Sequence, residues 1–325
     1  DESPTGRPCI IQVLDLGPGH GQATAPLNPL IVWPTKANWA VRFLAIFAAA
    51  LLLPGCGVAG GNTGQIAFAS ERAGNWQIFV MDAEGTDVRQ LTFDDGYHWA
   101  PVWSPDGKQI AFSGDWSGNR EILTMDSSGG GVIRLVTDNA RVDEDPSWSP
   151  SGDRLVYSGD AGGDFEVFIV KSDGTGTRQI TDNSSNEIHP VWSPDGDRIA
   201  FAGDLDGDLE IFAMDSDGGN LTQLTQNASI DWSPTWSPDG LSLAFSARTN
   251  GNWSVYTIGV DGGELHQITD NGSNDTDPVW SPDGGRIAFA SDRGGRYEVF
   301  TVTIDSMAID GTGQRGYPSD WIADG

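Results

Sequence analysis

The sequence has few cysteines and few lysines, and the shortage of cysteine excludes two kinds of site from most of the chain. Its 325 residues include two cysteines, Cys9 and Cys56, so the chain after position 56 can hold neither a disulfide nor a thiolate metal site. Lysine occurs only at positions 36, 108 and 171. A GxSxG motif is also missing, which argues against a serine hydrolase of the α/β type.

Positive charge is scarce in most of the chain. Lys and Arg together number 18 against 46 Asp and Glu, a formal net charge of −28. Residues 1–63 contain three acids and three bases, so the whole excess lies in residues 64–325. A body this acidic repels a phosphate backbone, and we therefore expect no nucleic-acid partner. The charge suits a cationic partner instead.

Long hydrophobic runs are also missing, since the longest apolar stretch, residues 43–53, has 11 residues. That is short for a bilayer span. Arg42 precedes it and small residues ending in Cys56 follow, the order found in a secretory signal. With Cys56 at its exit, the segment resembles the bacterial lipoprotein signal, and alternatives are a plain signal peptide or a buried apolar segment. The resemblance implies a signal peptide over 41–55, cleavage before Cys56, and acylation of that thiol as a membrane anchor.

The segments around this signal are expected to stand outside the folded body. Residues 1–40 show no periodicity, and we predict that they are non-native upstream sequence or a disordered segment. Residues 56–63 would form a short tether. The anchor implies a place in the cell envelope, at the outer membrane facing the periplasm or on the outer face of the cell membrane; Gly57 after the cysteine favours the outer membrane.

Glycine (43) and proline (18) are plentiful, and they separate short repeated phrases. The Trp of a WSPDG phrase recurs at 103, 148, 192, 236 and 280, spaced by 45, 44, 44 and 44 residues. An Ile-Ala-Phe phrase, an alternating phrase such as EIFAMD at 210–215, and a short RQLT phrase complete each unit. Four strands in about 44 residues predict one blade of a β-propeller.

Counting the phrases predicts how many blades there are and how the ring closes. The Ile-Ala-Phe and alternating phrases occur six times, and clear Trp phrases five times. The chain ends in a degenerate copy, Trp321–Gly325, whose next phrase in order is Ile66–Phe68. We therefore predict an all-β, six-bladed propeller over 64–325, closed by the C-terminal strand pairing with the N-terminal blade. A five-bladed ring with spare ends is the alternative.

The combined pattern PxWSPDGxxIAFxSxRxGxxEIFxMDxDGxxxxQLT resembles the TolB-type β-propeller family over residues 64–325. The resemblance implies the order of strands in a blade, with the PxW strand innermost and the QLT strand outermost. It also implies binding of other envelope proteins through the mouth of the central channel.

Two acidic motifs invite a catalytic or metal-binding interpretation, and we favour a structural one for both. Ser-Pro-Asp-Gly fits a type I turn, and Ser151 replaces the Asp in one copy. Asp204, Asp206 and Asp208 alternate as calcium ligands do, but they lack the EF-hand arrangement and sibling loops lack the acids. We therefore predict a hairpin turn there and regard these three acids as weak metal candidates.

The loops from each QLT phrase to the next PxW phrase are the best candidates for a site. Five of them have eight residues each, at 93–100, 138–145, 182–189, 226–233 and 270–277. Equal lengths place them in equivalent positions at the channel mouth. One interpretation is structural, with the sixth-position acids accepting backbone N–H bonds from the next blade. The other is an acidic, aromatic-edged funnel for a polar or cationic ligand, or for a peptide. The funnel residues would be His98, Trp99, Asp143, Asp145, Glu187, His189, Asp231, Trp232, Asp275 and Asp277.

Two functions follow from these loops. The first is a non-catalytic, monomeric, envelope-anchored module without a cofactor that binds a protein, peptide or polar ligand at the channel mouth. The second is a metal-assisted lyase or hydrolase, for which His98 and His189, with Asp143, Asp145 and Glu187, would have to supply the ligands.

Overall fold

The computed structural model describes residues 10–13, 65–82, 86–116, 118–129, 133–249, 251–263, 265–295 and 297–304. The predicted signal peptide, Cys56 and the tether lie outside these residues. Within the described segments, no helix has the length and apolar character needed to cross a membrane.

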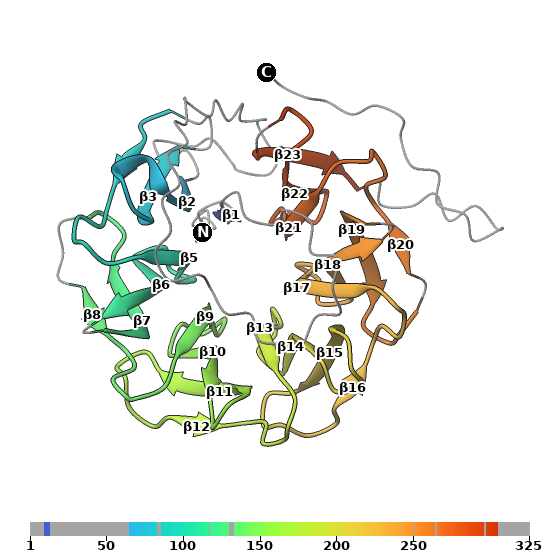
Figure 1. Cartoon of the computed structure of the whole chain (residues 1–325), viewed down its shortest axis with the longest axis horizontal. Helices are drawn as coiled ribbons and strands as arrows, with labels where there is room; N and C mark the ends of the chain where they lie inside the picture. The colour runs from blue at the N-terminus through green and yellow to red at the C-terminus, as the bar shows by residue number, and fades with distance from the viewer. Residues whose placement is uncertain are drawn as a thin grey trace, which may run out of the picture.

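The described strands form six sheets arranged as the blades of one ring (Figure 1). The prediction of a six-bladed all-β propeller is therefore confirmed. The first blade contains β1 (Ile10–Val13), β2 (Gln65–Ser70), β3 (Gln77–Asp82) and β4 (Arg89–Gln90), with a 3₁₀ turn at Glu71–Ala73. The second contains β5 (His98–Trp103), β6 (Gln109–Trp116), β7 (Asn119–Asp126) and β8 (Arg134–Leu135). The third contains β9 (Asp143–Trp148), β10 (Arg154–Asp160), β11 (Phe165–Lys171) and β12 (Arg178–Gln179).

The remaining three blades repeat the same order from the channel outward. The fourth contains β13 (Glu187–Trp192), β14 (Arg198–Gly203), β15 (Glu210–Asp215) and β16 (Thr222–Gln223). The fifth contains β17 (Ile230–Trp236), β18 (Ser242–Thr249), β19 (Asn252–Gly259) and β20 (His266–Gln267). The sixth contains β21 (Asp275–Trp280), β22 (Arg286–Ser291) and β23 (Glu298–Thr303).

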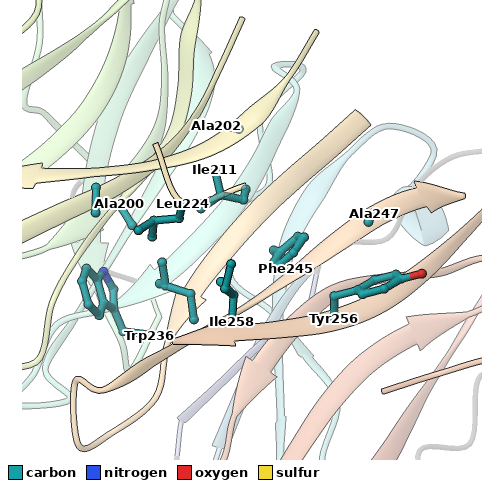
Figure 2. Packing of buried hydrophobic residues seen from close by; sticks show 11 residues of the cluster. Ala200, Ala202, Ile211, Leu224, Trp236, Phe245, Ala247, Tyr256 and Ile258 are labelled. Atoms are coloured by element: carbon teal, nitrogen blue, oxygen red, sulfur yellow. The ribbon is translucent and has the colours of Figure 1, made fainter. Parts of the chain in front are cut away.

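The hydrophobic core lies between neighbouring blades. The second strand of each blade is buried along nearly its whole length, as its unbroken Ile-Ala-Phe pattern requires of a strand covered on both faces. Between the fourth and fifth blades, Ile211 and Leu224 pack against Trp236, Phe245 and Ile258 (Figure 2). Each Trp of the repeated phrase thus serves the interface between blades, as its recurrence suggests.

The first blade is closed differently from the prediction. Beside β2 the structure places β1 in parallel, with Ile10 opposite Gln65 and Val13 opposite Phe68. Ile10–Val13 therefore takes part in the ring, although residues 1–40 were expected to stand outside it. The predicted partner, residues 318–325, lies outside the described residues. The physical reason is general, because the inner edge of β2 presents free N–H and C=O groups and the β-branched stretch IIQV can extend along it.

The Ser-Pro-Asp-Gly turns are hydrogen-bonded joints on the face of the ring opposite the QLT–PxW loops. Ser104 Oγ donates to Asp106 Oδ1 at 2.7 Å and accepts from the Gln109 N–H at 2.9 Å. The copies at Ser193, Ser237 and Ser281 repeat this geometry. The hydrogen bond from the Ser104 hydroxyl is the largest cause that lowers the pKa of Asp106. The structural interpretation of these aspartates agrees with this geometry.

The turn that lacks the aspartate recruits a carboxylate from two residues further on. Asp153 accepts from Ser149 Oγ at 3.1 Å and from Ser151 Oγ. We expect Asp153→Ala to lower the free energy of unfolding by about 1 kcal/mol, the usual net value of an exposed hydrogen-bonded group. Asp197→Ala, at the exposed equivalent position in the next blade, should leave urea denaturation unchanged. Equal losses in the two variants would contradict this role for Asp153.

Candidate channel-mouth site

The five eight-residue loops, here called the mouth loops, share one face of the ring. Each runs from the outer strand of one blade to the inner strand of the next. Figure 1 shows these inner strands, β5, β9, β13, β17 and β21, closest to the centre. The predicted site residues sit at the sixth, seventh and eighth positions of the loops.

The sixth-position residues turn into their own loops and are at most 1% exposed. Each is bonded to the side chain four residues earlier, not to the backbone of the next blade as the structural interpretation expected. Asn is the partner in four loops, because its amide can donate to a carboxylate while its own oxygen caps the turn. The distances are 2.8 Å for Asp94–His98, 2.7 Å for Asn139–Asp143, 2.9 Å for Asn183–Glu187, 2.9 Å for Asn227–Asp231 and 2.6 Å for Asn271–Asp275.

In three loops a second carboxyl group lies behind the sixth-position acid. Glu166, from the third strand of the preceding blade, accepts the N–H of Asn183 at 2.7 Å and acts on Glu187. Burial first, and then Glu166, raises the pKa of Glu187 to about 8. Burial likewise raises the pKa of Asp143, beside Glu121, and of Asp231, beside Glu210, to about 7. Each of these carboxyl pairs therefore holds a proton more tightly than an exposed carboxyl group does.

The mouth loops that enter the second and sixth blades have no second carboxyl group at the third-strand position behind the sixth-position residue. In the loop before β5, the third-strand residue is Gln77, whose Nε2 donates to the carbonyl oxygen of Gly96 at 2.8 Å. In the loop before β21, Ser254 stands in the third strand and Arg293 supplies a positive charge. Its Nη2 reaches both oxygens of Asp275, at 3.1 and 3.3 Å.

Glycines opposite the sixth position make room for these side chains. Gly114 pairs with His98, Gly159 with Asp143 and Gly203 with Glu187. A Cβ on Gly159 would approach Asp143 Oδ1 and Phe168 Cδ2 to 2.9 Å, which is closer than real contacts allow. The sixth-position residues thus have structural contacts within their own loops, in place of the backbone bonds to the next blade that were expected.

The eighth-position residues occupy a β-bulge and adopt a left-handed backbone. Each inner strand shifts register there. The φ angles are +49° at Ala100, +56° at Asp145, +51° at His189, +55° at Ser233 and +52° at Asp277. Such angles are uncommon outside glycine and cost energy, so their repetition marks a conformation that the ring imposes. The backbone N–H groups of Asp145 and Asp277 donate to Ser113 and Ser246 of the preceding blades.

Three of these eighth-position residues, Asp145, His189 and Asp277, act on one another, and we call them the inner ring. His189 Nδ1 lies 3.6 Å from Asp145 Oδ2. Asp277 acts electrostatically on both His189 and Asp145, although it stands on another blade. Burial lowers the pKa of His189 to about 4, raises that of Asp145 to about 7, and raises that of Asp277.

The two seventh-position aromatic residues, Trp99 and Trp232, have different surroundings. The Trp232 ring lies 4.4 Å from His189, at 60° to it, and holds the imidazole from one side. Trp99 is half-buried against the core between the first and second blades. The Arg120 guanidinium lies 5.5 Å from the Trp99 ring centre and forms an ion pair with Glu144. The pKa of Glu144 is raised to about 7, by burial first and by Asp145 second.

Exposed aromatic side chains at this face were missed by the sequence analysis. Phe93, Tyr97 and Trp116, here called the aromatic rim, are 74%, 50% and 37% exposed. The carbonyl oxygen of Tyr97 accepts the Asp115 N–H at 2.9 Å, so the mouth loop and the adjacent hairpin lie together. A signal was available, because Phe93 stands where the other four loops have Asp or Gln.

Of the predicted metal ligands, His189 and Asp145 lie 3.6 Å apart, while His98, Asp143 and Glu187 are engaged elsewhere. His98 bonds to Asp94 and packs edge-on against Phe112, while Asp143 and Glu187 are tied to asparagines. Both oxygens of Asp204 accept from Asn186, and Asp206 accepts from Gln223. Among the residues described, no group of three or more His, Cys, Asp and Glu could hold a metal ion.

Comparisons with known proteins agree with this architecture. A 52-residue stretch is 48% identical to the Tol-Pal system protein TolB of Geobacter metallireducens, and it covers 16% of this chain and 12% of that protein. The structure of TolB from Acinetobacter baumannii superposes with a TM-score of 0.63 and 23% identity, over 74% of this chain and 61% of that one. An oligogalacturonate lyase in complex with manganese has the same fold, with a TM-score of 0.53 and 16% identity over 74% and 86% of the two chains.

The family model for the TolB beta propeller domain matches residues 60–187, 136–232 and 226–325. These matches overlap and together extend from residue 60 to residue 325, which includes five blades and most of the first. The chain spans less than two thirds of the Geobacter and Acinetobacter TolB proteins. It belongs to the TolB beta-propeller domain family.

Proposed function

We propose that the chain is a monomeric, non-catalytic propeller of the cell envelope, lipid-anchored through Cys56, which binds a protein or peptide at its channel mouth. Membership of the TolB beta-propeller domain family supports a binding role in general, although the same fold occurs in enzymes. The name of the Geobacter relative, a Tol-Pal system protein, supports an envelope partner. Neither a cofactor nor a catalytic residue is part of the proposal.

The observation that carries the proposal is the contrast between the two faces of the ring. The mouth face combines the inner ring with the aromatic rim, and exposed aromatic side chains near polar groups are typical of partner-binding surfaces. The opposite face carries the Ser-Pro-Asp-Gly turns, whose polar groups bond to one another. The sequence alternative of a metal-assisted lyase or hydrolase has no group of ligands among the described residues to support it.

The test is capture of partners from envelope extract by the full chain. A rim variant with Phe93, Tyr97 and Trp116 all changed to Ser is expected to lose the partner captured by the wild type. The matched control changes Leu221, Leu241 and Leu265 to Ser. These leucines are 47%, 65% and 48% exposed in turns of the opposite face, so the control removes similar apolar surface. Equal capture by the rim variant and the wild type would refute binding at the mouth face.

A further inference from the structure

The inner ring contains a buried carboxyl group that lacks a hydrogen-bond partner on one oxygen. Asp277 is 7% exposed, and its Oδ2 has no hydrogen-bond partner within the described part of the chain. A buried carboxylate without a partner costs several kcal/mol, so such a group normally has a proton or a cation nearby. On the third blade, Asp145 Oδ2 lies 3.6 Å from His189 Nδ1, and Arg120 also acts on its charge.

The charged and titratable groups around the inner ring do not neutralise its two carboxyl groups. Arg120 is paired with Glu144, so its charge is largely used there. Burial first, and then Asp292 and Asp277, raises the pKa of Tyr297 to about 12, so its phenol stays neutral. His189 is held neutral by burial, with Trp232 against its ring. Within the described residues, no ion pair to Asp277 is found, and the cation that acts on Asp145, Arg120, is bonded to Glu144.

We propose that Asp145, His189 and Asp277 together bind one primary ammonium group, and that its arrival displaces protons from the two carboxyl groups. This rests on the proposed function and specifies the chemistry of the partner. The group would be a lysine side chain or the free N-terminus of an extended peptide entering the channel.

An ammonium group fits this arrangement better than the other cations. It is compact and has three donors that can point in different directions. The acceptors here come from three different blades, with Ser233 of the fifth blade close enough to act on Asp277. A guanidinium group needs two coplanar acceptors on one side, which the divided ring does not present. The net charge of −28 would draw such a segment toward the mouth.

The proton balance predicts how binding depends on pH. Burial raises the pKa of Asp145 to about 7, so this carboxyl group is largely protonated near pH 6, and burial raises the pKa of Asp277 as well. A bound ammonium ion stabilises their charged forms, so protons leave as it enters. Affinity should therefore rise about 10-fold between pH 5.5 and 7.5, with release of about one proton per peptide. His189 stays neutral throughout this range and contributes an acceptor nitrogen.

The experiment is titration calorimetry on the full chain in buffers of different ionisation heat. Three probes distinguish the sources: an acetylated, amidated pentapeptide with a central lysine, the same peptide with norleucine, and an amidated pentaglycine with a free N-terminus. At least one amine probe should bind and release protons. Asp145→Asn and Asp277→Asn should each weaken it about 10-fold or more. Asp182→Asn, an exposed acid in a mouth loop, is the control.

Three results would overturn the ammonium site. These are equal binding of the norleucine peptide, no binding of either amine probe at about 10 mM, or unchanged binding by both inner-ring variants that melt like the wild type. Partner capture separates this failure from that of the proposed function. If capture depends on the aromatic rim but survives the Asp145→Asn, Asp277→Asn double variant, the ammonium site fails and the proposed function stands.

Discussion

Raising the pH from 5 to 9 is expected to make the protein progressively easier to unfold with urea. The reason lies in the carboxyl pairs behind the mouth loops. Burial raises the pKa of Asp143 and Asp231 to about 7 and that of Glu187 to about 8. Between their ordinary pKa near 4 and these values, the folded protein holds protons that the unfolded chain releases. Their stabilisation is therefore complete at low pH and is lost as the pH rises to the folded pKa.

The size of this loss follows from linkage. Each group contributes about 1.4 kcal/mol per pH unit within its window, so three groups can change the free energy of unfolding by several kcal/mol. His189 acts in the opposite direction, because its lowered pKa favours the unfolded chain below pH 6.5. The decline in the urea midpoint should therefore be steepest between about pH 5.5 and 7, and it should level off above about pH 8.

Glu187→Gln provides the specific test. Its amide can donate to Glu166 as a protonated carboxyl does, but it cannot lose the proton. The variant should resemble the wild type at pH 5, exceed it in stability at pH 9, and show a shallower pH profile. Asp182→Asn, a change at an exposed acid, should leave the profile unchanged. A wild-type stability that rises between about pH 5.5 and 7 would contradict the account of the pairs.

Loss of the charge of Arg293 should be the most damaging single change at the mouth face. The carboxylate of Asp275 is 1% exposed, and Arg293 bonds to both of its oxygens while stacking 4.2 Å from the Phe300 ring centre. Removing one partner of a buried ion pair leaves an uncompensated charge, at a cost of about 3–5 kcal/mol. We expect this loss for Arg293→Met, which keeps the apolar stem against the ring.

A second change separates charge from packing. Asp275→Asn in the Arg293→Met background removes the stranded charge while the new amide can still meet Asn271. Most of the lost stability should return, measured by urea denaturation as a double-mutant cycle. If the double variant is as unstable as Arg293→Met alone, Arg293 does not stabilise the protein through its ion pair with Asp275. The sixth blade would then differ from its siblings for a reason of packing.

The repeat pattern was enough to predict the blades but not the direction of the mouth-loop side chains. Local propensity and spacing determine where β14 and β15 begin, and the buried Ile199–Phe201 phrase requires a neighbour on each face. Which way Glu187 turns depends on Asn183 four residues before it and on Gly203 across the strand. That combination of Asn, acid and opposite glycine is visible in the sequence, but it becomes a signal only when the register is known.

The three inner-ring residues were all among the predicted funnel residues, but their contacts with one another were not predicted. His189 stands out in the sequence because sibling loops have Ala, Asp or Ser at its position. Its left-handed backbone results from a bulge between Ile188 and Val191, which no local preference of histidine favours. The effect of Asp277 on His189 depends on the relative placement of two different blades. The strand beside β2 was also unpredictable, since an open sheet edge accepts more than one extended segment.

Site-specific photo-crosslinking in cells tests the central claim, binding at the channel mouth, most directly. A photoreactive amino acid would replace Tyr97 on the mouth face or Leu241 on the opposite face, both exposed positions. The account predicts that one partner crosslinks from position 97 and not from position 241, and that Asp145→Asn combined with Asp277→Asn weakens the crosslink. A partner that crosslinks from position 241 and not from position 97 would contradict it.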